Sequence, residues 1–413
     1  MPKPPHATEV RWHPRSWPVY HKDTIARVTR LVSDHRVFDY GRGNEIAALE
    51  DGFRVRYEGF SALAFNSGTS ALYAAYRALA FGPGMEVIVP TFTFQSTASP
   101  LVALGAIPVL CDAGGGDGNV TARSIADRVT SKTVGVVVTH LFGAPCELTE
   151  IHALCATRGL VLVEDCSHAH ASLYHGQPVG MHSDAAVFSL GARKMISGGH
   201  GGILLTRRSD VFDVACLVGH CKQRARASTL DPRLRALDDF GLGANMRMSP
   251  LAAVLAQEHL ANLVALGSEK RRLAHRLLAA AETLLGVQRI ATIDSGENNT
   301  YYDIVVLMSP GSDRGDRDNT IHLLRSRGLK VRSPATGLIH RSAMMHADAE
   351  TLTLLKAPSD NIALMQRATQ SATFHTAEKL YDRMISFPSE YIYHSTDRIV
   401  DEYIQEMSSV RLP

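Results

Sequence analysis

Short apolar runs alternate with helical segments along the first half of the chain. Residues that favour strands fill SALAF, EVIVP, IPVLCD, VGVVVTHLF, LVLVED, AAVFSL and GGILLT, and stretches such as SALYAAYRALA and LTEIHALCATRG have helical spacing. Runs such as VGVVV and LVLV are apolar at every position, which indicates strands that are covered on both faces. The pattern predicts an α/β fold with a mostly parallel central sheet.

The two ends of the chain differ from this pattern. Residues 1–20 combine prolines with charges and predict an irregular arm, and helices are expected in HKDTIARVTRLVSDH and EIAALEDGFRVRY. Near residue 207 the alternation stops, and a basic segment that is predicted to be irregular, Lys222–Arg235, leads to the long helical run PLAAVLAQEHLANLVALGSEKRRLAHRLLAAAETLL. Beyond it, YYDIVVLM predicts a strand, SDRGDRDN a loop and NTIHLLRSRG a helix. We predict a large domain over residues 21–250 and a smaller C-terminal α/β domain over residues 251–413.

Composition excludes several classes of protein. Of 413 residues, 45% are hydrophobic and 20% charged, which allows a sizeable core. Lys plus Arg number 43 against 41 Asp plus Glu, and this balance argues against a nucleic-acid or membrane partner. No apolar run reaches the roughly 18–20 residues of a membrane span, and the N-terminus has no apolar signal segment, so a cytoplasmic location is expected. The spacing of His140, Cys146, His152 and Cys155 matches no usual ligand set, so no metal site is predicted.

The segment FNSGTSALYAAYRALA carries the first candidate site. Gly68, Thr69 and Ser70 follow a strand and open an alanine-rich helix. The unpaired amides and the dipole of a first helical turn attract phosphate, and Gly68 lets an anion approach the backbone. The plainer interpretation is an ordinary Ser/Thr helix cap.

Two further candidates follow predicted strands. LVLVEDCSHAHAS ends a strand in Glu164-Asp165, at the edge where open α/β sheets bind ligands, and Lys194 stands between AAVFSL and a glycine-rich turn. Alone, Asp165 could be a helix cap and Lys194 a solvated amine. Combined with the phosphate site, they predict a pyridoxal phosphate site, where Asp165 pairs with the protonated pyridine nitrogen. Lys194 would close a Schiff base with the aldehyde and later act as general base and acid.

The order and wording of these motifs resemble the DegT/DnrJ/EryC1/StrS aminotransferases over nearly the whole chain. The matching segments are YGRGNEIAALEDGF, FNSGTSAL, GPGMEVIVPTFTFQSTAS, LGAIPVLCD, THLFGAP, VEDCSHAHA, FSLGARK and NMRMSPLAAVLAQ. The resemblance implies a fold-type-I pyridoxal phosphate-dependent transferase that acts mainly on keto-sugars and keto-cyclitols. It also implies Lys194 as the Schiff-base lysine and Asp165 as the partner of the pyridine nitrogen.

The same resemblance implies roles for residues around the coenzyme. Phe94 would stack on its ring, His168 would lie beside its phenolic oxygen, and Ser189 would lie near its phosphate. The plainer interpretations are a core phenylalanine for Phe94 and an ordinary strand-end hydroxyl for Ser189, and His170 is expected to be structural. In NMRM, Asn245, paired with Arg247, would reach the phosphate of the partner subunit, which implies a homodimer with shared sites.

Some positions depart from the family pattern. Leu190 and Arg193 stand where Phe and Thr are usual, His200 replaces Glu, Ala171 replaces Gly, and Met85 replaces Asp. These changes leave the catalytic groups in place and surround the expected mouth of the site. They therefore bear on the substrate more than on the chemistry.

The sequence as a whole predicts an aminotransferase that moves an amino group from glutamate or glutamine to a keto-sugar or keto-cyclitol in a biosynthetic pathway. Two alternatives stay open: another pyridoxal phosphate reaction (racemisation, decarboxylation or cyclodehydration), and a non-catalytic sensor that kept the pocket. A nicotinamide dehydrogenase is disfavoured because no GxGxxG follows the first strand. The basic segment Lys222–Arg235 could meet an acidic acceptor such as a nucleotide-sugar diphosphate, or it could be a solvated loop. The donor, the acceptor and the stereochemistry are left open.

Overall fold

The computed structural model describes residues 17–220, 222–290, 298–354, 359–389, 392 and 397–410. Most of the predicted arm, up to residue 16, and Cys221 lie outside these residues. The arm's described part, residues 17–20, has no helix or strand, and the first helix, α1 (Lys22–Ser33), begins shortly after it.

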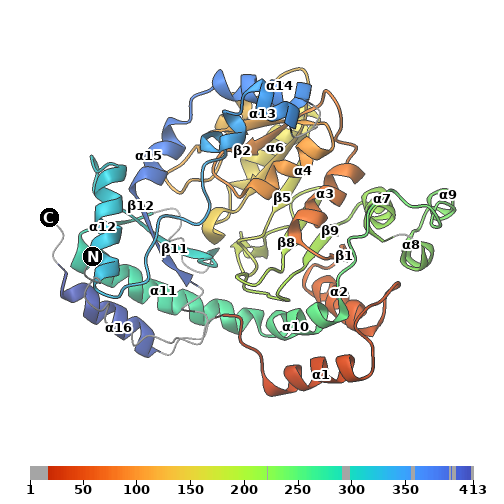
Figure 1. Ribbon diagram of the computed structural model, residues 1–413, viewed down its shortest axis with the longest axis horizontal. Coiled ribbons are helices and arrows are strands. Elements are labelled where there is room, and N and C mark those ends of the chain that lie inside the picture. The colour runs from red at the N-terminus through yellow and green to blue at the C-terminus, as the bar shows by residue number, and fades with distance from the viewer. Residues whose placement is uncertain are drawn as a thin grey trace.

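A seven-stranded sheet forms the centre of the molecule (Figure 1), and its strands run in the order β1-β9-β8-β5-β4-β2-β3. Neighbours from β8 to β3 are parallel, and β9 is antiparallel to both β1 and β8. The prediction of a mostly parallel sheet is confirmed. The strands are β1 (Ser61–Phe65), β2 (Glu86–Pro90), β3 (Ile107–Cys111), β4 (Thr133–Thr139), β5 (Val161–Asp165), β8 (Ala185–Ser189) and β9 (Gly202–Thr206).

The middle strands have no solvent face, and this explains their unbroken apolar runs. Val136, Val137 and Val138 are consecutive in β4, and all three are 0% exposed. Helices connect and cover the strands (Figure 1): α3 (Gly68–Ala78), α4 (Ser99–Ala103), α5 (Ala122–Ala126), α6 (Leu148–Arg158) and α7 (Ser209–Gly219). A short hairpin, β6 (Leu173–Tyr174) and β7 (Gln177–Pro178), lies between β5 and β8 in the chain.

Helices from distant parts of the chain pack below the sheet. α2 (Asn44–Arg56) and α1 both contact α10 (Pro250–Ala261), and the three lie together at the lower edge in Figure 1. Their buried residues, Leu49 and Phe53 of α2 and Ala253 and Ala256 of α10, join the hydrophobic cluster of the large sheet. The N-terminal helices therefore lie on the same body as the sheet.

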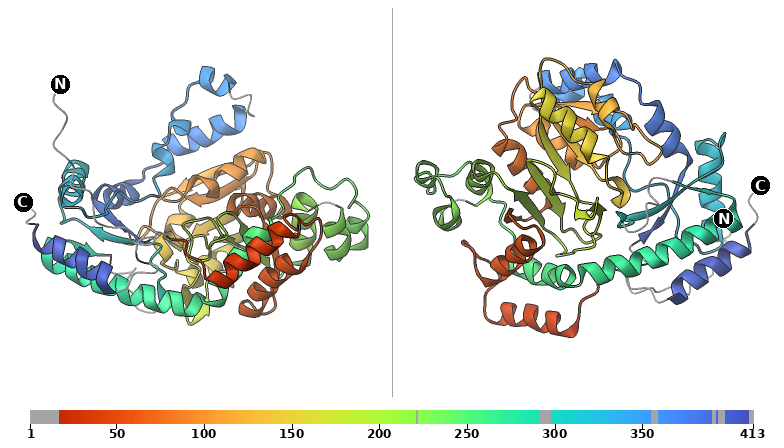
Figure 2. Two further views of the ribbon diagram at one scale, coloured as in Figure 1. Left: turned by 60° about the horizontal axis from the view of Figure 1, so that its bottom comes forward. Right: turned by 180° about the vertical axis from the view of Figure 1, so that it is seen from behind.

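A second hydrophobic cluster lies in the C-terminal part. An antiparallel sheet of β10 (Gln288–Arg289), β11 (Asp303–Leu307) and β12 (Met384–Pro388) packs with α11 (Leu263–Leu285), α12 (Arg314–Ser326), α15 (His375–Arg383) and α16 (Asp397–Ser408). α11 and α16 lie side by side in Figure 1 and in both views of Figure 2. None of the described helices is both long and apolar enough to cross a membrane.

The chain returns to the large sheet before it ends. α13 (Ala349–Leu354) and α14 (Ser359–Gln370) follow the second sheet's β11 in sequence, yet α14 contacts β3 of the first sheet. Leu352, Ile362 and Met365 belong to the first hydrophobic cluster. The predicted division at residue 250 stays a prediction, and the structure adds that residues of the C-terminal half pack on both clusters.

Three local predictions were wrong. The long helical run is two helices, α10 and α11, that meet at Asn262, whose side chain donates to the Glu258 carbonyl oxygen at 2.8 Å. SDRGDRDN is not a loop, because Asp313 caps α12 and Asp316 returns the bond in a capping box. The basic segment contains two short helices, α8 (Gln223–Ser228) and α9 (Pro232–Arg235). In the last two cases the segment is rich in charged residues, and its helical turns were therefore not recognised from the sequence.

Candidate active site

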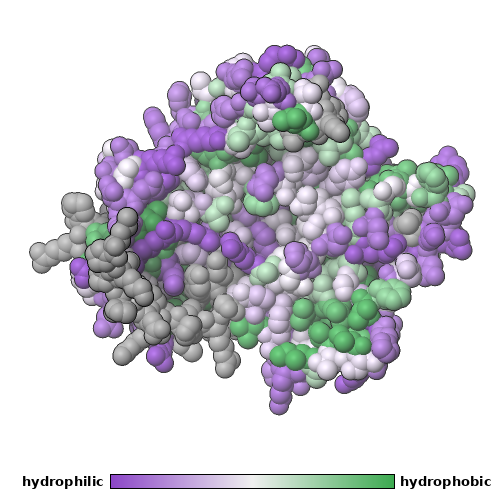
Figure 3. Space-filling view, in the orientation of Figure 1, coloured by the Kyte–Doolittle hydropathy of each residue, from purple (hydrophilic) through white to green (hydrophobic). Residues whose placement is uncertain are grey.

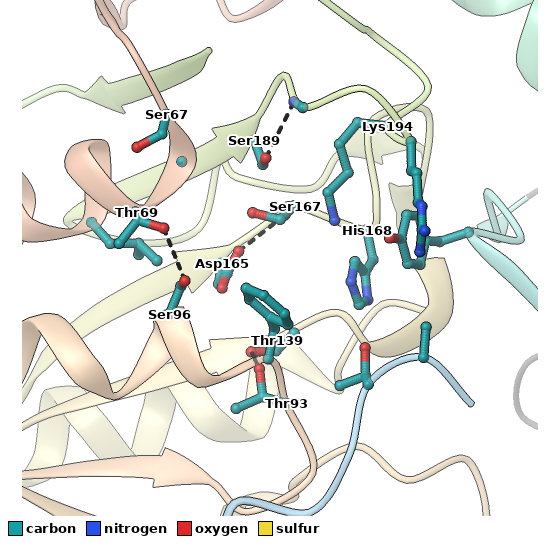
Figure 4. Close-up of a pocket in the computed structure, with 18 of the residues that line it drawn as sticks. Ser67, Thr69, Thr93, Ser96, Thr139, Asp165, Ser167, His168, Ser189 and Lys194 are labelled. Carbon is teal, nitrogen blue, oxygen red and sulfur yellow. Dashed lines mark hydrogen bonds between the residues drawn. The ribbon is translucent and has the colours of Figure 1, made fainter. Parts of the chain in front are cut away.

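The predicted site features gather around one pocket at the C-terminal ends of the large sheet's strands (Figure 4). The pocket has a volume of about 310 Å³. Most of the predicted site residues line it, namely Gly68, Thr69, Phe94, Asp165, His168, Ser189 and Lys194. Ser70 and Asn245 are not among its lining residues. The structure therefore brings together residues that lie more than a hundred positions apart, as the parallel sheet requires.

The first turn of α3 forms one end of the pocket. Ser67 caps the helix, since its Oγ accepts from the Ser70 amide at 3.0 Å, and the Ser70 hydroxyl donates to Asn66 Oδ1 at 2.7 Å. Thr69 Oγ1 donates to Ser96 Oγ at 2.9 Å. The helix-cap interpretation thus applies to Ser67 and Ser70. Gly68 and Thr69 line the pocket at the positive end of the helix dipole, where an anion is favoured.

Two glycines let this turn lie directly on the sheet. A Cβ at Gly68 would be 2.8 Å from Ser189 Cβ, and a Cβ at Gly202 would be 2.4 Å from the Ser67 carbonyl oxygen. Ser189 Oγ accepts from the Gly191 amide at 3.4 Å, beside the same turn. Sequence reasoning missed Gly202 as a site residue, although the glycine pair that opens GGILLT was the signal for close backbone approach.

Asp165 is 5% exposed at the end of β5. Its Oδ2 accepts from Thr97 Oγ1 at 2.8 Å, and its Oδ1 accepts from the Ser167 amide at 3.1 Å. Thr97 Oγ1 lies 2.9 Å from Thr93 Oγ1, which lies 2.8 Å from Thr139 Oγ1. A buried chain of threonines therefore fixes the carboxylate. Sequence reasoning missed this chain, because its threonines come from two segments that lie far from Asp165 in the sequence.

The neighbouring carboxylate, Glu164, faces away from the pocket, since successive side chains of a strand point to opposite faces. It is 0% exposed and lies 3.0 Å from His140 Nε2, and it accepts from the amides of Gly180 and His182. Burial favours the neutral acid, but the hydrogen bond and charge of His140 hold the pKa of Glu164 below its usual value. His140 Nδ1 accepts from the Cys146 amide at 3.1 Å, so this cluster is a hydrogen-bonded support beneath β5.

Lys194 lies in the turn after β8. Its amide donates to the Gly191 carbonyl oxygen at 2.9 Å, and its own carbonyl oxygen accepts from Trp17 Nε1 at 2.7 Å. Its Nζ lies 4.1 Å from the centroid of the Tyr302 ring. Burial lowers the pKa of Lys194 to about 8, although the nearby carboxylates of Asp165 and Asp303 act in the opposite direction. The amine is therefore much less basic than a solvated lysine.

Two histidines lie beside Lys194. The His168 ring stacks on Tyr302, with centroids 3.9 Å apart and planes 8° from parallel. Burial, followed by the positive charge of Lys194, holds the pKa of His168 well below its usual range. Its Nδ1 is buried and has no hydrogen-bond partner among the described residues. His170, whose pKa burial lowers to about 3, donates from Nε2 to the Ser189 carbonyl oxygen at 2.8 Å. His168 Nδ1 is thus available to a ligand, whereas the hydrogen bond of His170 supports β8.

The pocket mouth combines residues that the sequence pointed to with others that it did not. Phe94 is 48% exposed, so the core-phenylalanine interpretation is wrong. Arg193 and His200, two of the departures from the family pattern, are exposed and line the mouth. Tyr302, which ends YY before β11, was not singled out, and with Ala335 and Thr336 it closes the pocket from the C-terminal part of the chain.

Asn245 lies elsewhere on this chain. With Arg247 it lines a second pocket of about 280 Å³, beside Val37, Phe38 and Tyr40. The Arg247 guanidinium carbon lies 5.1 Å from the centroid of the Tyr40 ring. A single chain therefore does not bring Asn245 to Lys194, and its predicted contact with a partner's phosphate stays a prediction.

These groups fit pyridoxal phosphate. The glycine-lined helix end suits a phosphate, and the buried Asp165 suits a protonated ring nitrogen. His168 Nδ1, which has no partner among the described residues, offers a hydrogen bond to a ring oxygen. Lys194, with its lowered basicity, suits an aldehyde. The fold and the pocket together define the class as a pyridoxal phosphate-dependent enzyme.

Comparisons with known proteins place the chain within this class. The model of the DegT/DnrJ/EryC1/StrS aminotransferase family matches residues 20–402, and the chain belongs to this family of pyridoxal phosphate-dependent transferases. It is 28% identical over 304 residues to GDP-perosamine synthase of Escherichia coli O157:H7, covering 73% of this chain and 80% of that protein. It is 29% identical over 309 residues to L-glutamine:2-deoxy-scyllo-inosose aminotransferase of Streptomyces lividus, covering 72% of each.

Solved structures agree with the fold. An aminotransferase from Psychrobacter cryohalolentis superposes with a TM-score of 0.79 at 25% identity, covering 95% of this chain and 97% of that one. The predictions of a fold-type-I transferase, of the family, of an aminotransferase and of pyridoxal phosphate are thereby confirmed.

Proposed function

We propose that this aminotransferase moves the amino group of glutamine or glutamate to a keto-sugar or keto-cyclitol in a biosynthetic pathway. The observation that carries the proposal is the meeting of Lys194, Asp165 and the Gly68 turn in one pocket. The names of the relatives support the acceptor class, since they are a GDP-perosamine synthase and an L-glutamine:2-deoxy-scyllo-inosose aminotransferase. An intact lysine and acid also count against a sensor without turnover.

The residues that would contact the coenzyme have distinct chemical tasks in this reaction. When bound, the coenzyme supplies an aldehyde carbon that takes up amines and a ring that withdraws electrons from the reacting carbon. Asp165, held by Thr97 and the Ser167 amide, keeps the ring nitrogen protonated. Lys194 would hold the coenzyme and then, as a free amine, take a proton from the donor's α-carbon and deliver it to the coenzyme carbon that carried the aldehyde, C4′. Phe94 and His168 orient the ring.

The mouth of the pocket carries a positively charged side chain. Arg193 is exposed there, so an acceptor with a phosphate or carboxylate would be attracted, and the exposed His200 also lines the pocket. The basic segment Lys222–Arg235 is less suited to this task. Arg224 is buried against Glu50 at 2.9 Å, and Arg226 contacts Asp238 at 2.6 Å. These ion pairs within the chain favour a structural role for the segment.

A homodimer with shared sites is part of the proposal. Figure 3 shows apolar surface at the lower right of the molecule, near the segment between α1 and α2, and the exposed side chains of that segment include Val37, Phe38 and Tyr40. Asn245 and Arg247 line a pocket with these residues. A second copy that covers this surface would receive Asn245 near its own phosphate site, which explains why Asn245 lies away from Lys194 within one chain.

Half-reactions test the function directly. The coenzyme-loaded chain is mixed with L-glutamine or L-glutamate, and the spectral change to the aminated coenzyme is followed. Keto-sugars and keto-cyclitols are then screened against the aminated form. Lys194→Ala should lose both the lysine-bound absorbance and turnover while it stays folded. Loss of the α-proton without consumption of the amino group would instead indicate a racemase, and no spectral change with any donor would indicate a sensor.

Mixing two inactive variants tests the shared site. Lys194→Ala and Asn245→Ala each lack one half of the proposed site, and a mixed dimer contains one complete site. Re-association of the two should restore about one quarter of the parental activity, because half of the dimers are mixed and each has one good site. If the mixture stays inactive although mixed dimers are detected, Asn245 acts within its own chain.

A further inference from the structure

The Tyr302 ring contacts both Lys194 and His168. Lys194 Nζ lies 4.1 Å from the centroid of its ring, and the His168 ring stacks on it at 3.9 Å. The backbone on which the ring stands is fixed at both ends, because the Tyr302 amide donates to the Phe142 carbonyl oxygen at 2.7 Å and its carbonyl oxygen accepts from Ser389 Oγ. The ring is thus a rigid wall that the C-terminal part supplies to a site on the large sheet.

An aromatic ring in this position stabilises the charged form of the lysine that lies over its face. The face of an aromatic ring carries negative potential, and a buried ammonium within about 6 Å of the ring centre is held by it. Lys194 needs this help, since burial disfavours its charged form and brings its pKa to about 8. Asp303, a carboxylate that favours the charged form, also pairs with Arg332 at 3.0 Å. Asp165 accepts a hydrogen bond from Thr97 and, in the proposed function, also pairs with the ring nitrogen.

We infer that Tyr302 is a positioning residue that holds the ammonium form of Lys194 beside the reacting atoms whenever the lysine is not joined to the coenzyme. The inference rests on the proposed function, which requires Lys194 to leave the coenzyme and to return. A long lysine side chain has many rotamers, and ordering it costs conformational entropy. A fixed ring face limits the amine to one place, and the stack with His168 fixes the ring in turn.

The test measures Lys194 itself in the full chain freed of coenzyme. A small acylating reagent labels lysines at a series of pH values, and peptide mass spectrometry gives the midpoint for Lys194. The groups that face this amine are Asp165, His168, His170, Arg193, Asp303 and the Tyr302 ring. Tyr302→Leu keeps an apolar side chain but removes the aromatic face and the hydroxyl, and we expect the midpoint to move down by about half a unit to one unit.

Two comparisons separate the ring's charge distribution from its bulk. Tyr302→Phe keeps the aromatic face and should leave the midpoint within about 0.3 units of the parent. A trifluorinated phenylalanine at position 302 keeps the shape of the ring but cancels most of the negative potential of its face, so it should lower the midpoint as Tyr302→Leu does, even if Tyr302→Leu folds poorly. Tyr381→Leu, which removes a ring near Arg317 outside the pocket, is the matched control and should not move the midpoint.

The outcomes are decisive in both directions. A downward shift with the leucine and fluorinated variants, and none with Tyr302→Phe, supports the inference. An unchanged or raised midpoint in the fluorinated variant overturns it. Because labelling uses no substrate and no coenzyme, this result is independent of amino transfer: if the half-reactions fail while the shift occurs, the proposed function is wrong and the contact stands.

Discussion

Trp17 donates from its indole Nε1 to the carbonyl oxygen of Lys194 at 2.7 Å, across 177 positions of the chain. Trp17 is 6% exposed, and its ring stacks on that of His259 with centroids 4.3 Å apart. Because His259 belongs to α10, this helix also fixes the position of Trp17. The next aromatic of the arm, Tyr20, donates its hydroxyl to the Ser197 carbonyl oxygen at 3.0 Å. The arm before α1 therefore fastens the turn that carries the lysine.

Trp17→Phe should loosen this turn. Phe keeps an aromatic ring but loses the N–H donor, and a hydrogen bond of this kind contributes about 1 kcal/mol to the free energy of unfolding. We expect faster hydrogen exchange at the amides of Lys194 and Gly198, which bond within the turn. Tyr20→Phe is the matched control, because it removes a bond to Ser197 on the same arm. Equal exchange at Lys194 in both variants would show that Trp17 has no special effect on the lysine.

Gly202→Ala should weaken phosphate binding. The added Cβ would lie 2.4 Å from the Ser67 carbonyl oxygen and 2.7 Å from the Gly68 amide nitrogen, so the helix N-terminus must move away from β9. We expect the Kd for pyridoxal phosphate to rise at least about tenfold, or about 1.4 kcal/mol. Pyridoxal, which lacks the phosphate, should lose much less affinity. Gly116→Ala is the control, since a Cβ at Gly116 meets nothing within 4 Å.

Thr97→Val should disturb Asp165. The variant keeps the volume of Thr97 but removes its hydroxyl donor, and a bond to a buried carboxylate is worth about 1.5–3 kcal/mol. Turnover and coenzyme affinity should each fall about tenfold or more. Thr93→Val, one step further along the chain of hydroxyls, should have a smaller effect. Thr157→Val changes an exposed hydroxyl bonded to its own helix and should have none. Equal losses in Thr93→Val and Thr97→Val would argue against this chain of support.

The lowered pKa of Lys194 predicts a pH profile for coenzyme attachment. Only the neutral amine attacks an aldehyde, and with a pKa of about 8 its population rises as the pH rises and levels off above that value. The rate of attachment to the coenzyme-free chain should therefore increase about tenfold per pH unit well below 8 and flatten above it. Stopped-flow absorbance measures this rate. A profile that climbs to about pH 10, as for a solvated lysine in a model peptide, would show that burial does not act on this amine.

Much of the central part of the fold could be predicted from local pattern. The unbroken apolar runs of β4 and β5 indicated strands covered on both faces, and the motifs at strand ends placed Gly68, Asp165 and Lys194 at one edge of a parallel sheet. This works because strand direction and side-chain alternation are local properties, and parallel strands bring their carboxyl ends together whatever the length of the connections.

Only the tertiary structure decided what surrounds those three residues. The partners of Lys194 are Trp17 and Tyr302, and the support of Asp165 is Thr97, Thr93 and Thr139. No spacing along the chain encodes these contacts, because each depends on how separate elements pack. For the same reason, only the tertiary structure shows that Asn245 lies outside the pocket of Lys194. Its position depends on the packing of its segment beside residues 37–40.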